Sequence, residues 1–268
     1  MTISIGAHVD QTDPIAEATA RQAPLVQFFL GDPQSYRGPE VRYAGGAAGL
    51  RADAESAGID LYVHAPYILN VATTNNRIRI PSRKLLQQHV DAAAEVGAKG
   101  LIVHGGHVDK AGNDVELIAK GFDNWRKAVE ATDLAVPLLI ENTAGGDNAM
   151  TRHLERIAGV WDAIASAEGA DDVGFCLDTC HAHAAGNSLE TVVADVRAIT
   201  GRIDLVHCND SRDNFGSGAD RHAGLGAGRI DPDLIAAVVR DAAAPVVCET
   251  PGGAAEHRVD FQWLRGRL

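Results

Sequence analysis

The sequence predicts an α/β protein in which residues 1–268 form a single domain, a (β/α)8 barrel. Short apolar runs, typical of buried strands, alternate eight times with amphipathic stretches typical of helices. The length of 268 residues is close to the roughly 250 residues that such a barrel needs. Six of the apolar runs also end in a His, Asp or Glu, so we expect a trinuclear metal site at the carboxyl ends of the strands.

The eight expected strands are short and apolar, as the interior of a buried strand must be. They cover residues 3–7, 25–30, 61–63, 100–103, 137–140, 173–177, 203–206 and 245–248. An open doubly wound sheet is the main alternative, but it would bind ligands at one switch point and not at the ends of six consecutive strands. In a barrel the active site lies at the carboxyl ends of the strands, so the ligand positions favour the barrel.

The expected helices lie between the strands, and several begin or end at residues that favour helix termini. They are placed near residues 14–22, 46–57, 82–97, 115–131, 151–166, 188–200, 231–241 and 256–266. Ser82 and Ser188 are expected N-caps, and Asp231 is an N-cap followed by proline in the first turn. Gly58 and Gly97 fall where helices should stop.

Nine potential metal ligands lie at or near the carboxyl ends of these strands. They are His64, His104, Glu141, Asp178, His181, His207, Asp220, His222 and Glu249. His, Asp and Glu together are the ligands of zinc or a similar divalent metal. Nine are too many for one ion and about right for three. A lone His at a strand end is more often a hydrogen-bonded residue than a ligand, but six repeats of the same placement are far more specific.

The spacing of these residues indicates how they could share the ions. If the chain turns after Asp178, that carboxylate and His181 can face different ions. Asp220 and His222 fall on the same side of an extended segment and can chelate one ion. Glu141 has two oxygens and could bridge a metal pair. Two metals about 4 Å apart can activate a water and clamp an in-line phosphoryl displacement.

Other histidines and the cysteines have less specific interpretations. His8 also follows an apolar run and could either bind metal or support a ligand through a hydrogen bond. His89 and His257 fall on expected helices, where exposure to solvent is the default expectation. The four cysteines fit no zinc-binding spacing and are expected to be reduced. Strand alternation turns Cys208 and Cys248 away from the ligands, toward the helices.

The net charge of −12 argues against a general nucleic-acid binder, which is usually basic. Four proposed ligands are carboxylates, so three divalent ions would make the site itself positive and able to attract a phosphate.

No apolar stretch approaches the roughly 20 residues of a membrane span, and the first residues lack the pattern of a secretory signal. We therefore expect a cytoplasmic protein that does not bind membranes.

At these residues the chain resembles endonuclease IV, the zinc-dependent apurinic/apyrimidinic endonuclease family of base-excision repair. The resemblance extends over most of the chain. It is strongest in residues 140–145 (IENTAG), 178–182 (DTCHA), 207–210 (HCND) and 220–222 (DRH). Together these segments are highly specific, although no single one would be.

The resemblance implies a DNA-repair hydrolase with three zinc ions, with manganese left open at one position. His64, His104 and Glu141 would hold the first ion, and Glu141 would be the catalytic carboxylate that bridges to the second. The second ion would also be held by Asp178, His207 and Glu249, and the third by His181, Asp220 and His222. In the family an activated hydroxide attacks the phosphate 5′ to an abasic site in double-stranded DNA, leaving a 3′-hydroxyl and a 5′-deoxyribose phosphate. Family likeness suggests a monomer.

Six residues are implied to contact DNA. Tyr67 and Ile68 match an aromatic–aliphatic pair that enters the DNA at the lesion. Gln34 stands where the family often has an Arg directed at the orphan base, and Arg37 is a nearby substitute. The last two, Arg77 and Arg221, are basic residues of loops on the catalytic face. For Tyr67 a buried loop anchor is the alternative, and for the basic residues a solvated loop.

Two other functions remain to be weighed. A metal-dependent sugar isomerase or epimerase of the xylose-isomerase-like barrel group would share the fold, and fold alone does not fix function. Such enzymes usually need one or two metals, so the additional set of His181, Asp220 and His222 argues against them. A non-catalytic binder of damaged DNA would be expected to have lost ligands, and all nine are present.

Overall fold

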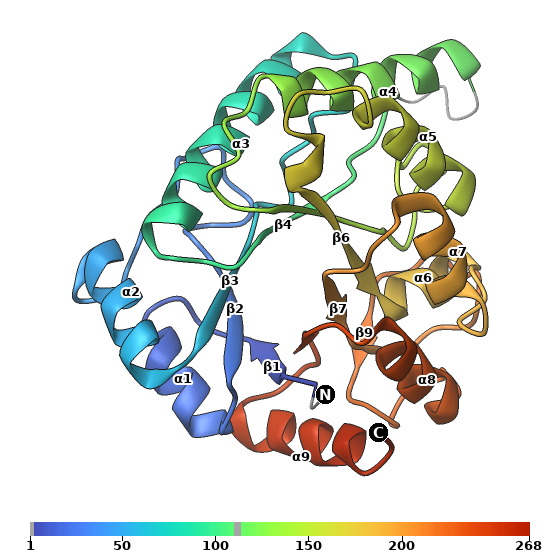
Figure 1. The fold of residues 1–268 in the computed structure, drawn as a ribbon. Coiled ribbons are helices and arrows are strands. Elements are labelled where there is room, and N and C mark those ends of the chain that lie inside the picture. Colours follow the sequence, from blue (N-terminus) through green and yellow to red (C-terminus); the bar gives the residue numbers. More distant parts are fainter. Residues whose placement is uncertain (1–2, 110–113) are drawn as a thin grey trace.

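Eight parallel strands close into a barrel in the computed structural model, which describes residues 3–109 and 114–268 (Figure 1). Their order around the barrel is β1-β10-β7-β6-β5-β4-β3-β2. The strands are β1 (Ile5–His8), β2 (Leu25–Phe29), β3 (Asp60–His64), β4 (Leu101–His104), β5 (Leu138–Glu141), β6 (Val173–Asp178), β7 (Leu205–His207) and β10 (Val246–Cys248). Closure excludes the doubly wound sheet and confirms the predicted barrel, with strand bounds close to those expected.

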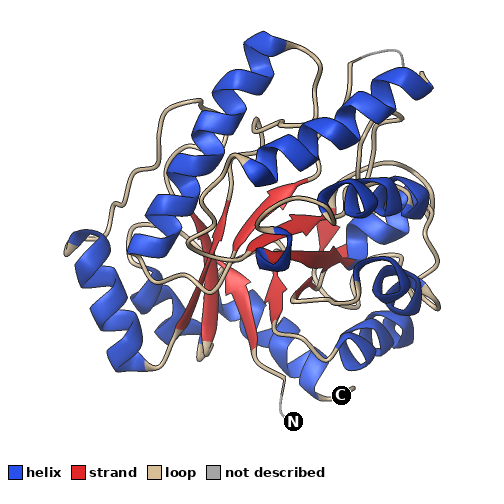
Figure 2. Cartoon of the chain, turned by 45° about the horizontal axis from the view of Figure 1, so that its top comes forward, coloured by secondary structure: helices blue, strands red, loops and turns tan. Residues whose placement is uncertain are grey.

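A ring of helices surrounds the strands, which lie at the centre of the molecule (Figure 2). The helices are α1 (Pro14–Arg21), α2 (Gly46–Ala57), α3 (Asn76–Glu95), α4 (Val115–Glu130), α5 (Leu154–Ile164), α6 (Thr179–Ala185), α7 (Val192–Thr200), α8 (Pro232–Ala242) and α9 (Ala254–Arg265). A short 3-10 helix covers Ala170–Asp172. Asp231 caps α8 by accepting from the amide of Asp233, as predicted. Among the described residues, no helix is long and apolar enough to cross a lipid bilayer.

The side chains that point into the barrel form an apolar layer. This layer consists of Leu25, Tyr62, Ile102, Leu139, Cys176, Leu205 and Val247, one from each strand except β1. On β1 the equivalent position is Gly6, where a Cβ atom would lie only 1.9 Å from the carbonyl oxygen of Leu25. The apolar layer therefore fills the barrel. Glycine is required at position 6 because any side chain there would collide with Leu25 of β2.

The outward-facing side chains of the strands pack against the helices in a second, larger core. Val63, Val103 and Ile140, each directly before a proposed ligand, belong to this outer core. Cys208 and Cys248 also belong to it and are fully buried, which confirms their predicted position beneath the helices. Alternation along each strand thus separates the helix-facing residues from those that face the barrel interior.

Three local predictions were wrong. Helix α3 begins at Asn76 and not at Ser82, because Asn75 caps it by accepting from the amide of Arg77. Ser82 lies inside α3, where its hydroxyl accepts from the amide of Asn70. The segment that contains Arg77 is therefore helical and not a loop. Helix α7 begins at Val192, after Thr191, so Ser188 is not its cap.

Two elements that follow the carboxyl ends of β6 and β7 were not predicted at all. Helix α6 begins directly after Asp178, whose carboxylate caps it by accepting from the amide of His181 (2.6 Å). An antiparallel pair, β8 (Asp210–Ser211) and β9 (His222–Ala223), follows β7. Both elements are too short to leave a periodic pattern in the sequence, yet each carries proposed ligands.

Candidate metal centre

The proposed ligands form a polar layer directly above the apolar layer of the barrel. On β3, β4 and β5 the two layers are two residues apart, so their side chains share the inner face of the strand. The same spacing holds for the later strands and places Asp178, His207 and Glu249 on the inner face. One strand geometry thus positions six of the nine proposed ligands at the carboxyl end of the barrel.

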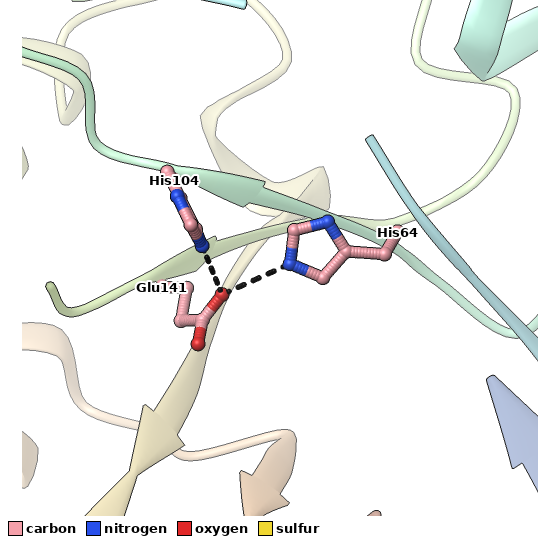
Figure 3. Close-up of side chains that lie close together, drawn as sticks. All are labelled: His64, His104 and Glu141. Carbon is pink, nitrogen blue, oxygen red and sulfur yellow. Dashed lines mark hydrogen bonds and ion pairs between the residues drawn. The ribbon is translucent and has the colours of Figure 1, made fainter. Parts of the chain in front are cut away.

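His64, His104 and Glu141 form the first group of converging donors (Figure 3). Nε2 of His64 and Nε2 of His104 each lie 3.2 Å from Oε2 of Glu141. His104 and Glu141 are partners in the register of β4 and β5, which brings them to the same level. Glu141 is fully buried, whereas the His104 side chain is 22% exposed. The group is therefore accessible to solvent from the His104 side.

Glu141, Asp178, His207 and Glu249 form the second group. Nδ1 of His207 lies 3.0 Å from Oε1 of Glu141 and 3.4 Å from Oε2 of Glu249. Asp178 is the register partner of His207 across β6 and β7. The two oxygens of Glu141 thus face different groups, so this one carboxylate joins the first group to the second.

His181, Asp220 and His222 form the third group. Oδ1 of Asp220 lies 3.2 Å from Nε2 of His181 and 3.2 Å from Nε2 of His222. Nδ1 of His181 lies 2.9 Å from the carbonyl oxygen of Asn142, which orients the ring with Nε2 toward Asp220. The short elements α6 and β9 are therefore what bring this group beside the barrel axis.

Cys180 lies close to this third group, although sequence reasoning assigned it no role. It offers a donor atom within 4.8 Å of donors from Asp178 and His222. Burial raises the pKa of its thiol to about 12. Because the thiolate and not the thiol binds metals, the nitrogen and oxygen donors of the third group are the better ligand set.

The chemistry of these donors fits divalent cations. Histidine nitrogens and carboxylate oxygens are the ligands of zinc and similar metals. Burial raises the pKa of Glu141, but His207 and His104 outweigh it and the pKa lies well below its usual range. Nε2 of His222 is buried and makes no properly directed hydrogen bond among the described residues, although Asp220 is near. A cation would satisfy that nitrogen and the clustered carboxylates together.

The pKa of His222 also reflects its carboxylate neighbours. Burial lowers this pKa, but Asp220 and Asp178 outweigh the burial and raise it to about 9. A cation bound by the third group would replace the proton on the ring as the partner of these carboxylates. Metal binding at neutral pH should therefore release protons.

Two buried amides hold proposed ligands in place, and sequence reasoning missed both. Gln27 on β2 donates to Oε1 of Glu249 (2.7 Å), and its Oε1 lies 2.8 Å from Nε2 of His207. Asn209 donates to Oδ2 of Asp178 (2.7 Å) and accepts from the amide of Glu249 (2.8 Å). The only sequence signal for Gln27 was a polar residue inside the apolar run 25–30.

His8 lies beside this network. Its Nδ1 lies 3.0 Å from Nε2 of Gln27 and 3.6 Å from Oε1 of Glu249. Within the described part of the chain it belongs to none of the converging donor groups. Its position therefore favours a hydrogen-bonding neighbour of the ligands over a ligand.

The residues expected to contact DNA lie outside the donor groups. Tyr67 is 50% exposed, so it is not a buried anchor. Its ring centroid lies 5.5 Å from that of His64 and 5.6 Å from that of His104. The carbonyl of Ile68 accepts a hydrogen bond from the hydroxyl of Tyr36, which is exposed and has no distinguishing pattern in the sequence. Tyr67 thus stands at the edge of the first group, and Ile68 follows it in the chain.

The other four residues are all exposed. They are Gln34, Arg37, Arg77 and Arg221. Arg221 forms an ion pair with Asp213, although its side chain is 63% exposed. Gln34 and Arg37 lie in the same loop after β2, whereas Arg77 lies on α3 and Arg221 lies directly before β9.

A groove of about 890 Å³ leads away from the donor groups. Tyr67, His104, His181 and Asp220 line one part of it, and the segments 106–109 and 143–149 contribute to its walls. The groove therefore opens onto donors of the first and third groups.

Comparison with known proteins decides the family. Residues 16–267 match the family model described as "Xylose isomerase-like TIM barrel". "Probable endonuclease 4" of Mycobacterium tuberculosis (strain ATCC 25177 / H37Ra) is 56% identical over 263 residues, which cover 98% of each chain. The chain belongs to the endonuclease 4 family.

Solved structures agree with this membership. The crystal structure of endonuclease IV from Thermus thermophilus superposes with a TM-score of 0.81 at 27% identity, covering 99% of this chain and 98% of that one. A D-tagatose 3-epimerase-like protein superposes with a TM-score of 0.80 at 19% identity, covering 99% of this chain and 97% of that one. At that low identity the second likeness shows the shared barrel alone.

Proposed function

We propose that this endonuclease 4 family member is a metal-dependent DNA-repair hydrolase that cleaves the phosphodiester bond 5′ to an abasic site. Its products would be a 3′-hydroxyl and a 5′-deoxyribose phosphate. The observation that carries this proposal is the chain of three donor groups, in which Glu141 belongs to two and Asp178 lies beside the third. Such a cluster suits hydrolysis of a phosphodiester, in which the attacking and the leaving oxygens must both be stabilised.

We assign each donor group to one cation, with zinc as the expected metal and manganese as an option at one position. His64, His104 and Glu141 would hold the first; Glu141, Asp178, His207 and Glu249 the second; His181, Asp220 and His222 the third. When bound, the cations supply Lewis-acid chemistry, because they polarise phosphate oxygens and lower the pKa of coordinated water. Glu141 is the residue on which the assignment depends most, since both of its oxygens are used.

The residues around the cluster would receive and orient the DNA. Tyr67 is exposed and its ring stands against His64 and His104, so a base step opened by Tyr67 and Ile68 would present its sugar-phosphate next to the first group. Gln34 and Arg37 would contact the DNA near the orphan base. Unstacking the bases costs a few kcal/mol, which contacts to the exposed lesion offset.

Two exposed arginines would contact phosphates and position the duplex. Arg77 lies in the first turn of α3, and Arg221 lies between Asp220 and His222. Such contacts give affinity without sequence information. We propose that the whole chain acts as one domain and as a monomer on abasic duplex DNA in the cytoplasm.

A sugar isomerase or epimerase is the weaker alternative. The D-tagatose 3-epimerase-like neighbour shares the barrel, but at 19% identity it supports nothing beyond the fold. The third donor group has no evident purpose in an enzyme that needs one or two metals. The 56% identity to a probable endonuclease 4 also favours the nuclease.

The test combines metal analysis with a cleavage assay. Wild-type protein and a His181→Ala/His222→Ala variant are analysed for zinc and manganese and then incubated with a duplex that carries one abasic-site analogue. We expect three cations per wild-type chain and incision 5′ to the lesion, and we expect the variant to lose one cation and the incision. A wild-type chain with one or two cations and no incision would exclude the proposal, and sugars would then be screened for isomerisation.

A further inference from the structure

A buried carboxylate outside the donor groups joins two of the segments that carry ligands. Asp260 on α9 is 5% exposed. Its Oδ1 accepts a hydrogen bond from the amide of Leu225 (2.9 Å), and its Oδ2 accepts one from the hydroxyl of Thr250 (2.5 Å). Leu225 follows β9, which contains His222, and Thr250 follows Glu249 directly. One carboxylate therefore connects the segment of the third group to that of the second.

The same network is anchored in the helices around the barrel. His257 on α9 donates from Nε2 to the carbonyl oxygen of Thr250 (2.9 Å), and its Nδ1 accepts from Nε of Arg21 on α1 (2.8 Å). Arg21 and His257 are both buried, at 5% and 2% exposure, so the expectation that His257 would be exposed was wrong. His257 uses both ring nitrogens inside the protein, which fixes its orientation. The segment after Glu249 is thereby tied to two helices.

The two connected segments meet at the ligands themselves. Nδ1 of His222 lies 3.2 Å from the carbonyl oxygen of Glu249. The place of His222 relative to Glu249 therefore depends on how the two segments are held. Leu225 and Thr250 are buried, at 6% and 4% exposure. Without the carboxylate, a buried amide and a buried hydroxyl would lose their partner, and the segments would have to move to satisfy them.

We propose that Asp260 is a positioning residue of the metal centre, whose carboxylate sets the place of His222 relative to Glu249. This inference rests on the proposed function in that the donor groups bind cations. It does not require that the cations cleave DNA. Partners that orient metal ligands typically change metal affinity by about 10–100-fold when they are removed.

The experiment compares isosteric changes inside and outside the network. Thr250→Val removes the hydroxyl that donates to the Asp260 carboxylate. Asp260→Asn keeps the size of the side chain but replaces one of its two acceptor oxygens with an NH2 group that cannot accept. Thr200→Val is the matched control, because Thr200 is also buried and its hydroxyl contacts the carbonyl oxygens of Arg202 and Val196. Thr200 is the last residue of α7 and lies on neither of the two connected segments. Each protein is stripped with a chelator and titrated with Zn²⁺ against a chromophoric competitor, and its thermal midpoint is measured.

We expect Thr250→Val and Asp260→Asn each to weaken the most weakly bound cation by about tenfold or more. The double variant should be little weaker than either single one, because both changes break the same hydrogen bond. The control should lower the thermal midpoint while leaving all zinc affinities within about twofold, well inside the tenfold change expected above. If Asp260 positions the ligands, the network variants should regain cleavage when zinc is raised. A loss of the folded structure would not be reversed by added zinc.

The opposite result is equally clear. If Thr250→Val and Asp260→Asn lower the thermal midpoint but bind zinc as tightly as wild type, the positioning role is wrong. If Asp260→Asn fails to fold, Thr250→Val alone decides by the same criterion. If the wild-type protein binds cations but does not cleave abasic DNA, the proposed function is wrong. The zinc titration would still test the positioning role of Asp260, because it measures metal affinity and not cleavage.

Discussion

Two layers of side chains inside the barrel differ in chemistry although they are built by the same strands. On β5, Leu139 belongs to the apolar layer, and Glu141, two residues later, belongs to the polar layer. Leu139 is 2% exposed and Glu141 is 0% exposed, so burial does not distinguish them. Apolar packing at Leu139 stabilises the fold, whereas a buried carboxylate at Glu141 costs stability unless a charge offsets it.

The comparison shows how the barrel separates stability from function. The apolar layer fills the interior and needs only volume and shape. The polar layer has clustered ionisable groups, and burial raises the pKa of Asp178 because nothing in its surroundings fully compensates the lost hydration. Changes in the polar layer should therefore affect metal binding and activity, and changes in the apolar layer should affect stability. Three substitutions test this division.

The largest effect is expected for Glu141→Gln. The amide keeps the size of the side chain but removes the charge that two donor groups share. We expect single-turnover cleavage of an abasic duplex to fall by about 10⁴-fold, which corresponds to roughly 5 kcal/mol of lost transition-state stabilisation. Elemental analysis should show at least one cation fewer, while the circular dichroism spectrum stays that of wild type. Activity within tenfold of wild type would show that the shared carboxylate is dispensable.

The next effect is expected for Leu139→Ala, in the layer below. Truncating a buried leucine costs about 2–5 kcal/mol through lost burial and the cavity left behind. For a chain of this size that corresponds to a fall in the thermal midpoint on the order of 10 °C. Metal content and kcat at 20 °C should stay close to wild type.

A chelator provides the matched comparison for that variant. Wild-type protein should also lose stability when stripped of its cations, because a ligand held at 100 times its Kd stabilises by about 2.7 kcal/mol. Added zinc should restore this loss but not the loss caused by Leu139→Ala. If zinc rescued the leucine variant, the two layers would not be independent.

The convergence of the proposed ligands could be predicted from the sequence because these residues break a simple pattern. His64, His104 and Glu141 each end an apolar run, and parallel strands in a barrel bring such ends together. The structure brings all nine predicted ligands into three groups. Side-chain alternation was also sufficient to place Cys208 and Cys248 beneath the helices.

The supporting residues could not be predicted, because their roles depend on long-range contacts. Asp260 follows Thr250 by ten residues on a different element, and nothing in the local sequence pairs it with Leu225. His89 was expected to be exposed, yet it is 1% exposed on α3, where its Nδ1 contacts the carbonyl of Leu85. A helical histidine is buried or exposed according to the face that packs on the barrel, and a single residue does not reveal that face.

Gln27 gives the smallest predicted effect and the sharpest test of the boundary between the layers. It lies beside Tyr62 in the register of β2 and β3, and it holds both His207 and Glu249 through one amide. Gln27→Leu would extend the apolar layer upward by one residue and leave Nε2 of His207 without its partner. We expect zinc affinity to fall by about 10–100-fold with little change in thermal midpoint of the metal-free protein. Tyr62→Phe, a change of similar size in the apolar layer, is the control and should leave zinc affinity unchanged in the same competition titration. Equal affinities for the two variants would mean that the strand alone, and not the amide, orients the ligands.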